Sequence, residues 1–294
     1  MLSLDTIRTD VDNWVKELDL KREPRNLYTP ITYSLSLGGK RLRPLMCVAT
    51  CALFKDDYSP AKNAALALEM FHNFTLLHDD LMDRADVRRG KPTVYRKWND
   101  NVAVLSGDAM LTMATQYIAR ASDKAMRPVM ELYNKTAMEI YEGQQWDMDF
   151  EHRDDVKEEE YIEMIRLKTS VLLGCACKMG ALLGGACKAV ADDFYHMGVN
   201  VGLAFQLQDD VLDVWGNPAT FGKATGGDIM NNKKTFLLIN AMNMAAGDDA
   251  KELRRWLDDT DAKPEEKIPA VTAVYEKLGL RELSEQRIAM FSDH

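Results

Sequence analysis

Two runs of the sequence repeat the pattern D-D-x-x-D in apolar surroundings. The residues are Asp79, Asp80 and Asp83 in the first run and Asp209, Asp210 and Asp213 in the second. On a helix, residues i and i+4 lie on one face, about 6 Å apart along the axis. Two carboxylates so placed repel each other unless a cation lies between them, and Mg²⁺ prefers oxygen ligands and keeps substrate phosphates in its shell. The two runs therefore indicate a site that holds Mg²⁺ around a diphosphate.

The other aspartate pairs of the chain do not repeat this pattern. None has an aspartate four positions after its first residue; they lie at 56–57, 154–155, 192–193, 248–249 and 258–259. Burying uncompensated carboxylates costs several kcal/mol each, so two runs in apolar helices favour metal or cationic partners. The pair His78-Asp79 would also suit a metal-dependent phosphohydrolase, which needs a further histidine well upstream. No histidine precedes His72, so that function is excluded.

Basic residues gather in several short segments along the chain. Residues 38–44 combine a glycine turn with Lys40, Arg41 and Arg43, and Arg88-Arg89-Gly90-Lys91 follows the first aspartate run. Further cations are found in the segments Lys168-Thr169, Gly222-Lys223 and Asn232-Lys233-Lys234-Thr235. Arginine grips phosphate oxygens with a fixed fork, whereas lysine acts as a point charge. Together with the aspartates, these cations indicate a binding site for two diphosphates.

The elements that position these residues are predicted to be long helices. Three- and four-residue steps connect Ala65, Leu68, His72, Thr75, Asp79 and Asp83, and also Leu203, Gln206, Asp210 and Asp213. The nine prolines are expected at helix boundaries, because proline breaks helix interiors. No run of period two and no Asn-Gly hairpin signal is found. We expect one all-α domain over residues 1–294, with helices also in the charged segment 245–294.

Composition narrows the function classes. The 294 residues include 37 Lys+Arg and 46 Asp+Glu, a formal net charge of -9, which argues against nucleic-acid binding. Five cysteines without a zinc spacing are expected to be reduced thiols that fill small spaces in a cytoplasmic protein. The first 20 residues carry no export signal. The most apolar segment, Ser170–Cys187, has Lys178 at its centre, where a charge in a membrane costs about 2.5–3.5 kcal/mol, so we expect a buried helix and no membrane span.

The order and spacing of these motifs resemble the trans-polyprenyl diphosphate synthases. The resemblance covers residues 37–238 and rests on five segments: 38–44, 78–92, 168–169, 205–213 and 222–235. It implies an all-α, single-domain helical bundle around a deep central cavity, the isoprenoid synthase fold, with the aspartate motifs facing each other at its mouth. It also implies a homodimer, with isopentenyl diphosphate and an allylic prenyl diphosphate as substrates.

The resemblance also assigns roles to individual residues. Mg²⁺, in a set of three ions, would be held by Asp79, Asp83 and Asp209, and Asp80 belongs to the same catalytic motif. The allylic diphosphate would be contacted by Arg88, Lys168, Thr169, Gln206 and Lys223. Isopentenyl diphosphate would be bound by Lys40, Arg43, His72 and Arg89, and Lys233 would lie near the allylic group.

The reaction implied by the resemblance needs no covalent nucleophile. Metals and cations stabilise the departing diphosphate, so that the allylic C–O bond ionises to a carbocation. The alkene of isopentenyl diphosphate attacks C1 of that cation, and a proton is then lost to the released diphosphate. Water must be excluded from the cation, and an apolar helical cavity would exclude it.

Product length in this family depends on the residues four and five positions before the first aspartate. Here these are Thr75 and Phe74, and Phe71 lies one turn below as a second barrier. One ring at the two positions favours a C20 product, with C15 next. The first motif also lacks the two extra residues that bacterial farnesyl diphosphate synthases carry, which lowers the C15 expectation.

Two other functions remain open at this point. A class I terpene cyclase also ionises an allylic diphosphate, but it normally lacks the second D-D-x-x-D motif and the cations that bind isopentenyl diphosphate. A non-catalytic regulatory subunit of a prenyl synthase tends to lose one aspartate motif, and this chain keeps both. Consumption of isopentenyl diphosphate by the isolated chain separates the enzyme from the silent subunit.

Overall fold

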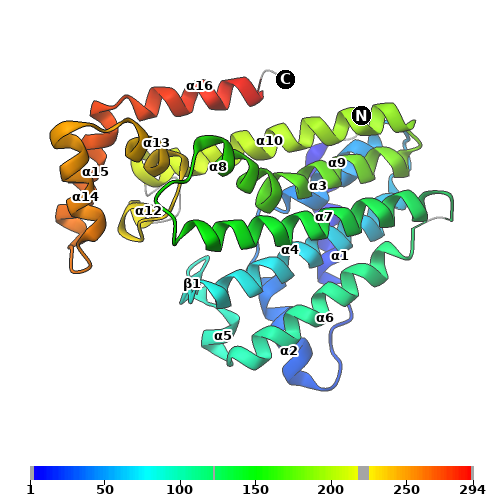
Figure 1. The fold of residues 1–294 in the computed structure, drawn as a ribbon. Coiled ribbons are helices and arrows are strands. Elements are labelled where there is room, and N and C mark those ends of the chain that lie inside the picture. Colours follow the sequence, from blue (N-terminus) through cyan, green and yellow to red (C-terminus); the bar gives the residue numbers. More distant parts are fainter. Residues whose placement is uncertain (1–2, 122, 218–224, 293–294) are drawn as a thin grey trace. The chain divides into compact units, whose positions relative to one another are not determined.

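The computed structural model describes residues 3–121, 123–217 and 225–292, and it confirms the all-α prediction (Figure 1). The helices of the first half are α1 (Leu4–Lys16), α2 (Arg25–Ser36), α3 (Leu42–Ala52), η1 (Ser59–Ala61), α4 (Lys62–Met82), α5 (Val94–Lys97), α6 (Asp100–Ile118) and α7 (Asp123–Phe150). Those of the second half are α8 (Glu158–Ile165), η2 (Arg166–Ser170), α9 (Val171–Gly184), α10 (Lys188–Trp215), α12 (Gly227–Met230), α13 (Phe236–Met244), α14 (Gly247–Asp258), α15 (Pro264–Lys277) and α16 (Leu280–Ser292). The helices predicted for residues 245–294 are therefore confirmed.

Prolines mark some helix boundaries but not all of them. Pro264 is the first residue of α15, as expected. The expectation is wrong for Pro30, Pro128 and Pro269, which lie inside α2, α7 and α15. Each is the sixth residue of its helix, where proline removes a single N–H bond to a carbonyl one turn earlier and leaves the rest of the helix intact. Pro218 lies outside the described residues.

The residues group into two compact units. Unit 1 comprises Met1–Lys135 and Leu172–Tyr195. Within it α4 packs along α6 and also contacts α1, α2 and α3. Alanines on α4 such as Ala64 and Ala67 are buried, and small side chains let neighbouring helices approach closely. Helix α4 is thus the central support of unit 1, and it carries the first aspartate motif at its end.

Unit 2 comprises Thr136–Val171 and His196–His294. Its C-terminal helices pack on one another, with α15 in contact with α12, α13, α14 and α16 (Figure 1). Their shared core contains Leu237, Trp256, Val271 and Leu280, all of them buried. The second aspartate motif lies near the end of α10, within this unit. Because the contacts define units rather than folding domains, a single domain over residues 1–294 stays a prediction.

A short hairpin interrupts the helical pattern after α4. Its strands β1 (Val87–Arg88) and β2 (Lys91–Pro92) are antiparallel, with Arg88 paired to Lys91. Arg89 and Gly90 form the turn with φ of 53° and 72°, and positive φ at both turn residues suits the twist of a tight hairpin. The sequence did not predict this hairpin, because its strands are only two residues long and its turn is Arg-Gly instead of Asn-Gly.

One helical stretch, Glu158–Gly184, is long and apolar enough to cross a membrane by length and composition. In this structure 78% of its most apolar 18-residue segment is buried inside the protein, as is also found for core helices. The side chain of Lys178 on this stretch lies 2.5 Å from Asp192 Oδ1, so its charge is paired within the protein. These observations support the expected buried helix.

The cysteines lie mostly in the core of unit 1. Cys47, Cys51, Cys175 and Cys177 are buried, and Cys187 is exposed. Burial raises the pKa of the Cys47 thiol well above its ordinary value and that of Cys177 to about 12. Protonated, buried thiols are small apolar fillers, as the sequence suggested.

Candidate active site

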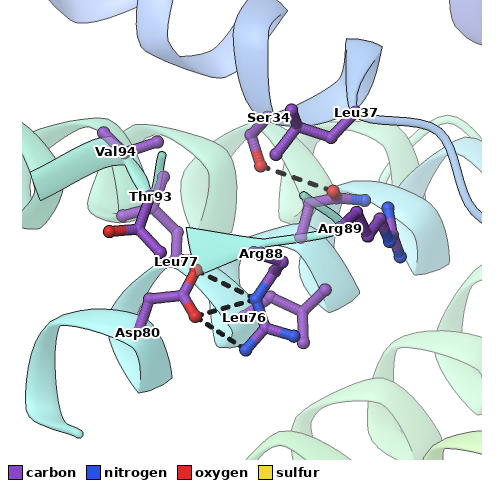
Figure 2. A pocket seen from close by; sticks show the side chains of 10 residues that line it. Ser34, Leu37, Leu76, Leu77, Asp80, Arg88, Arg89, Thr93 and Val94 are labelled. Atoms are coloured by element: carbon purple, nitrogen blue, oxygen red, sulfur yellow. Dashed lines mark hydrogen bonds and ion pairs between the residues drawn. The ribbon is translucent and has the colours of Figure 1, made fainter. Parts of the chain in front are cut away.

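The first aspartate motif is built on the last turn of α4, beside the β1–β2 hairpin. Arg88 extends from β1 toward Asp80, and its Nε lies 2.8 Å and 2.9 Å from the two carboxylate oxygens (Figure 2). Burial raises the pKa of Asp80, and the hydrogen bonds and charge of Arg88 oppose that rise. The carboxylate of Asp80 is therefore occupied by an ion pair with Arg88 within the protein.

Asp79 and Asp83 differ from Asp80 in their surroundings. Asp83 caps the C-terminus of α4, and its N–H donates to the carbonyl oxygen of Asp79 at 2.9 Å, so the two residues are one helical turn apart. The side chain of Asp79 is 22% exposed, against 7% for Asp80, and Asp83 is exposed. Nη2 of Arg88 lies 3.7 Å from Asp79 Oδ2. The two residues predicted as metal ligands are thus the more accessible members of the motif.

A cationic cluster lies next to this motif in unit 1. Nη1 of Arg43, on α3, lies 3.2 Å from Nε2 of His72 on α4. Burial lowers the pKa of His72 well below its ordinary value, and the charges of Arg43, Arg89, Arg88 and Arg41 lower it further. A neutral His72 that accepts a hydrogen bond from Arg43 through Nε2 carries its proton on Nδ1, where it can donate to an anion. The cluster brings together three of the four residues predicted to bind isopentenyl diphosphate, while the fourth, Lys40, is exposed.

The glycine turn before α3 is shaped to receive Arg89. A guanidinium nitrogen of Arg89 donates to the carbonyl oxygen of Gly38. Gly39 has a φ of 134°, and a Cβ on it would lie 2.7 Å from Nη2 of Arg89, so a side chain there would displace the guanidinium. The predicted glycine turn thus positions a predicted substrate residue from a distant segment.

Arg41, in the same segment, has a different role. Its side chain is 8% exposed and forms an ion pair with Glu69, which is itself buried. Nη2 of Arg41 also donates to the carbonyl oxygen of Leu35 at 2.6 Å, and Asn73 Nδ2 donates to Glu69 Oε1 at 2.6 Å. Arg41 and Glu69 therefore anchor the turn, and Glu69 supplies a counter-charge for the cationic cluster.

The pocket in Figure 2 lies beside these residues, and its wall contains both arginines of the hairpin. Its lining residues are Ser34, Leu37, Asn73, Leu76, Leu77, Asp80, Arg88, Arg89, Thr93 and Val94. In Figure 2 Arg88 turns toward Asp80, whereas Arg89 extends away from it. The adjacent arginines of the sequence therefore serve two different partners.

The second aspartate motif has the same internal arrangement. Asp210 is 4% exposed and accepts hydrogen bonds from the hydroxyl of Tyr161, from Gln206 Nε2 at 3.3 Å and from the backbone N–H of Phe236 at 3.3 Å. Burial raises the pKa of Asp210 to about 7, although the Tyr161 hydrogen bond lowers it. In both motifs the middle aspartate is held inside the protein, while Asp79 and Asp209 are partly exposed.

Lys168 and Thr169 lie in η2, a π-helical turn. A π-turn widens the helix and occurs often at functional sites. Nζ of Lys168 lies 2.5 Å from Asp147 Oδ2, and Thr169 Oγ1 donates to Gln206 Oε1 at 3.5 Å. Gly143 on α7 permits this arrangement, because a Cβ there would lie 2.4 Å from the backbone nitrogen of Lys168. The structure thus connects η2 to the second aspartate motif through Gln206.

The remaining predicted cations lie in the segment after α10. The charge of Lys233 lowers the pKa of Asp210, so its ammonium acts on the second motif. Asp228 at the start of α12 donates its N–H to Asp213 Oδ2 at 3.1 Å, which ties this segment to α10. Lys223 lies outside the described residues.

The predicted chain-length residues lie on α4, with Thr75 and Phe74 about one turn below the first motif and Phe71 about two turns below it. Phe71 is fully buried, Phe74 is 6% exposed, and their ring centroids are 5.4 Å apart. The ring of Phe74 also meets that of His78 at 4.8 Å, and Phe71 meets Tyr133 at 5.5 Å. Thr75 donates its hydroxyl to the carbonyl oxygen of His72 at 2.8 Å. An edge-to-face aromatic cluster therefore lies beneath Asp79.

Magnesium fits the donor set of both motifs. Among the described residues, no group of three or more His, Cys, Asp or Glu side chains is close enough to hold a metal by itself. Mg²⁺ does not need such a group, because it is usually bound by one or two carboxylates together with substrate phosphates and water. The partly exposed carboxylate of Asp79 and the exposed Asp83, one helical turn apart, match that requirement.

Three residues of these networks were missed in the sequence. Glu69, Asp147 and Tyr161 respectively pair with Arg41, Lys168 and Asp210. Their partners lie 28, 21 and 49 positions away in the chain, so no local spacing could reveal them. Glu69 alone carried a local signal, because it is a charge in an otherwise apolar helical stretch.

Comparison with known proteins places the chain in a family. The family model described as Polyprenyl synthetase matches residues 24–275, so the chain belongs to the polyprenyl synthetase family. The geranylgeranyl diphosphate synthase of Methanosarcina mazei is 42% identical over 233 residues, which cover 79% of this chain and 72% of that protein. The geranylfarnesyl diphosphate synthase of Natronomonas pharaonis is 36% identical over 252 residues, covering 80% and 74% of the two chains.

A solved structure agrees with these relatives. A crystal structure of a geranylgeranyl pyrophosphate synthase is 44% identical, covers 99% of this chain and 90% of its own, and superposes with a TM-score of 0.93. The chain therefore has the fold of isoprenyl synthases and is a short-chain prenyl diphosphate synthase, a prenyltransferase of isoprenoid biosynthesis. The resemblance inferred from the motifs is confirmed.

Proposed function

We propose that this prenyltransferase condenses isopentenyl diphosphate with an allylic diphosphate and releases all-trans geranylgeranyl diphosphate, a C20 product. The observation that carries the chain length is Phe74, a buried ring five residues before Asp79 that packs on Phe71 and His78. A ring in that position blocks a growing chain that descends along α4. Relatives named as geranylgeranyl diphosphate synthases support C20. C15 is the next alternative, and a relative named as a geranylfarnesyl diphosphate synthase adds C25 as a third.

Magnesium is part of this proposal. Asp79 and Asp83 of the first motif and Asp209 of the second would hold the ions, and Asp80 would fix Arg88 beside them. The bound metal would neutralise the diphosphate and make it a better leaving group. A deep central cavity and the three-ion set remain predictions from the family.

The protein's own side chains bind, orient and stabilise charge. Arg88, Lys168 and Gln206 would contact the allylic diphosphate together with Thr169 and Lys223, and Lys233 would lie close to the allylic group. Arg43, His72, Arg89 and Lys40 would bind isopentenyl diphosphate, with the Nδ1 proton of neutral His72 donated to a phosphate oxygen. When the allylic C–O bond breaks, the departing diphosphate gains charge that these cations stabilise.

The bond changes balance without a covalent intermediate. The allylic C–O bond electrons leave with the diphosphate, and the alkene of isopentenyl diphosphate forms the new C–C bond to C1. The internal alkene carbon then carries the positive charge. The carbon next to it loses a proton to the released diphosphate, and the electrons of that C–H bond form the new double bond. The aromatic side chains below Asp79 keep water away from the cation during these steps.

The setting of the enzyme completes the proposal. We infer a homodimer that lies in the cytoplasm, does not span the membrane and does not bind nucleic acid. The formal net charge of -9 and the burial of the apolar stretch Glu158–Gly184 support the last two statements.

Product analysis tests the function directly. Purified protein with Mg²⁺ and isopentenyl diphosphate receives dimethylallyl, geranyl or farnesyl diphosphate in separate reactions, and mass spectrometry identifies the product. A single C20 product supports the proposal, whereas C15, C25 or longer products overturn the chain length. A cyclised hydrocarbon would indicate a terpene cyclase. No reaction with any starter would indicate a non-catalytic subunit.

A further inference from the structure

A lysine is buried in the C-terminal part of unit 2. Lys267 on α15 is 2% exposed, which makes it one of the largest fully buried side chains of the described residues. A buried ammonium is costly unless it is paired or hydrogen-bonded. Its Nζ donates to Oδ1 of Asn232 at 2.7 Å. Burial lowers the pKa of Lys267, and the charge of Asp259 opposes that shift.

Asn232 uses its amide to connect two helices. While Oδ1 accepts from Lys267 on α15, Nδ2 donates to the carbonyl oxygen of Leu257 on α14 at 2.9 Å. The backbone of Asn232 has a φ of 51°, in the left-handed region that asparagine tolerates better than most residues. Both ends of the amide are therefore fixed at the residue where the chain changes direction, directly before Lys233.

The turn around Asn232 is also tied to the second aspartate motif. The N–H of Lys233 donates to the carbonyl oxygen of Asp228 at 3.0 Å, and the N–H of Asp228 donates to Asp213 Oδ2 at 3.1 Å. The ammonium of Lys233 acts on buried Asp210 from this turn. A continuous series of contacts thus runs from Lys267 through Asn232 to the cation beside the motif.

We propose that Lys267 is a positioning residue for the allylic diphosphate subsite: by holding Asn232 in its left-handed turn, it sets the position of the Lys233 ammonium. This inference rests on the proposed function, which places Lys233 near the allylic group. An apolar side chain of similar length would fill the same space but would leave Oδ1 of Asn232 without its donor. The effect therefore concerns the allylic substrate and leaves the isopentenyl diphosphate residues of unit 1 untouched.

Steady-state kinetics of Lys267→Met test the assignment. We expect the KM for the allylic diphosphate to rise about tenfold, because a displaced Lys233 ammonium would make a weaker charged contact with the diphosphate, while the KM for isopentenyl diphosphate stays unchanged. Lys263→Met is the matched control, because it removes the same charge from an exposed position at the start of the same helix. Both its KM values should equal those of the wild type.

Asn232→Gly provides a second route that leaves every residue of α15 unchanged. Glycine keeps the left-handed turn but removes both side-chain hydrogen bonds. It should reproduce the selective rise in the KM for the allylic diphosphate. In the double variant this KM should be no higher than in the single variant with the larger rise, since both changes break the same contact between Lys267 and Asn232. If Lys267→Met fails to fold, Asn232→Gly alone decides the matter.

Equal rises in both KM values, or a lower Tm with both KM values unchanged, would mean that Lys267 is only structural and would overturn the assignment. Equilibrium binding of a thiolodiphosphate analogue of the allylic substrate, with Mg²⁺, gives a readout that needs no turnover. The variants should bind it about tenfold more weakly than the wild type. Should wild-type protein consume no isopentenyl diphosphate, the proposed function fails, while this binding comparison still tests the role of Lys267.

Discussion

The guanidinium of Arg88 holds both carboxylate oxygens of Asp80, with its Nε at 2.8 Å and 2.9 Å from them. The neighbouring carboxylate of Asp79 lies farther away, with 3.7 Å between its Oδ2 and Nη2 of Arg88. One arginine thus distinguishes two adjacent aspartates that look equivalent in the sequence. Asp80 fixes the position of Arg88, whereas the carboxylate of Asp79 is partly exposed.

This difference predicts two distinct mutant behaviours. Asp79→Ala should lower turnover at saturating Mg²⁺ by at least about 10²-fold, as expected when a main source of charge stabilisation is lost, with little change in Tm. Asp80→Asn should instead lower Tm, because Arg88 loses a charged partner in a mostly buried pair. Steady-state assays and thermal unfolding measure the two effects. Near-normal turnover of Asp79→Ala would refute the metal role.

The protein should also lose stability when Asp210, the middle aspartate of the second motif, loses the hydrogen bond from Tyr161. Tyr161→Phe removes the hydroxyl that donates to Asp210 and should destabilise the protein by about 1–3 kcal/mol, the cost of a lost hydrogen bond to a buried carboxylate. Tyr275→Phe is the control, because it removes the same hydroxyl from another buried tyrosine of unit 2. Denaturant unfolding compares the two variants, and equal losses would contradict a specific role for the Tyr161 hydroxyl.

Local signals in the sequence were enough to predict the fold class and the helix that carries the first aspartate motif. The i, i+4 spacing of Asp79 and Asp83 correctly places both at the end of one helix, since the apolar steps of α4 extend unbroken to that point. The resemblance of the motifs was confirmed by the family match. Lys168 stays a predicted substrate residue, and its π-helical turn was not expected, because the apolar spacing of the sequence does not distinguish a π-turn from an α-helix.

The sequence could not separate functional charges from structural ones. Arg41 and Arg43 belong to one basic run, yet Arg41 pairs with buried Glu69, while Arg43 contacts His72. Buried Lys267 looks like an ordinary surface lysine in the acidic start of α15. In each case the partner comes from a distant segment, and only the packed structure shows which cations already have an ionic or hydrogen-bonding partner within the protein.

The cysteines provide a simple test of packing in unit 1. One thiol, Cys187, should react promptly with a disulfide reagent at neutral pH, and all five should react in denaturant. Burial excludes the reagent from the other four and raises the pKa of Cys47 and Cys51, so little thiolate is available. Cys187→Ser should remove the fast reaction. Two or more fast thiols in the native wild type would contradict the burial of this cluster.

His72 should make stability fall in mild acid. Its pKa in the folded protein lies well below the ordinary 6.5, so the unfolded chain binds a proton there that the folded protein does not. Stability contributed by neutral His72 is complete above pH 6.5 and is lost as the pH falls from 6.5 toward the folded pKa. His72→Gln cannot titrate and should lose less stability over that window than the wild type.

Denaturant unfolding at a series of pH values measures this difference. His152→Gln is the control, because His152 is exposed and its replacement should leave the pH profile unchanged. Identical acid profiles for the wild type and His72→Gln would show that His72 does not remain neutral among the arginines.

The aromatic cluster below Asp79 predicts a change in product length. Phe74→Ala removes a ring that packs on Phe71 at 5.4 Å and on His78 at 4.8 Å, and it opens space along α4 where the growing chain would end. The product should lengthen by one or more C5 units, as measured by mass spectrometry. Leu66→Ala is the matched control: Leu66 is buried on the same helix but lies outside the steps that connect Thr75 to Asp79, and its loss also leaves a cavity that costs about 2–5 kcal/mol of stability. If cavities in general altered the product, both variants would lengthen it. A longer product from Phe74→Ala alone assigns the effect to the ring, whereas an unchanged product would exclude Phe74 as the floor of the elongation pocket.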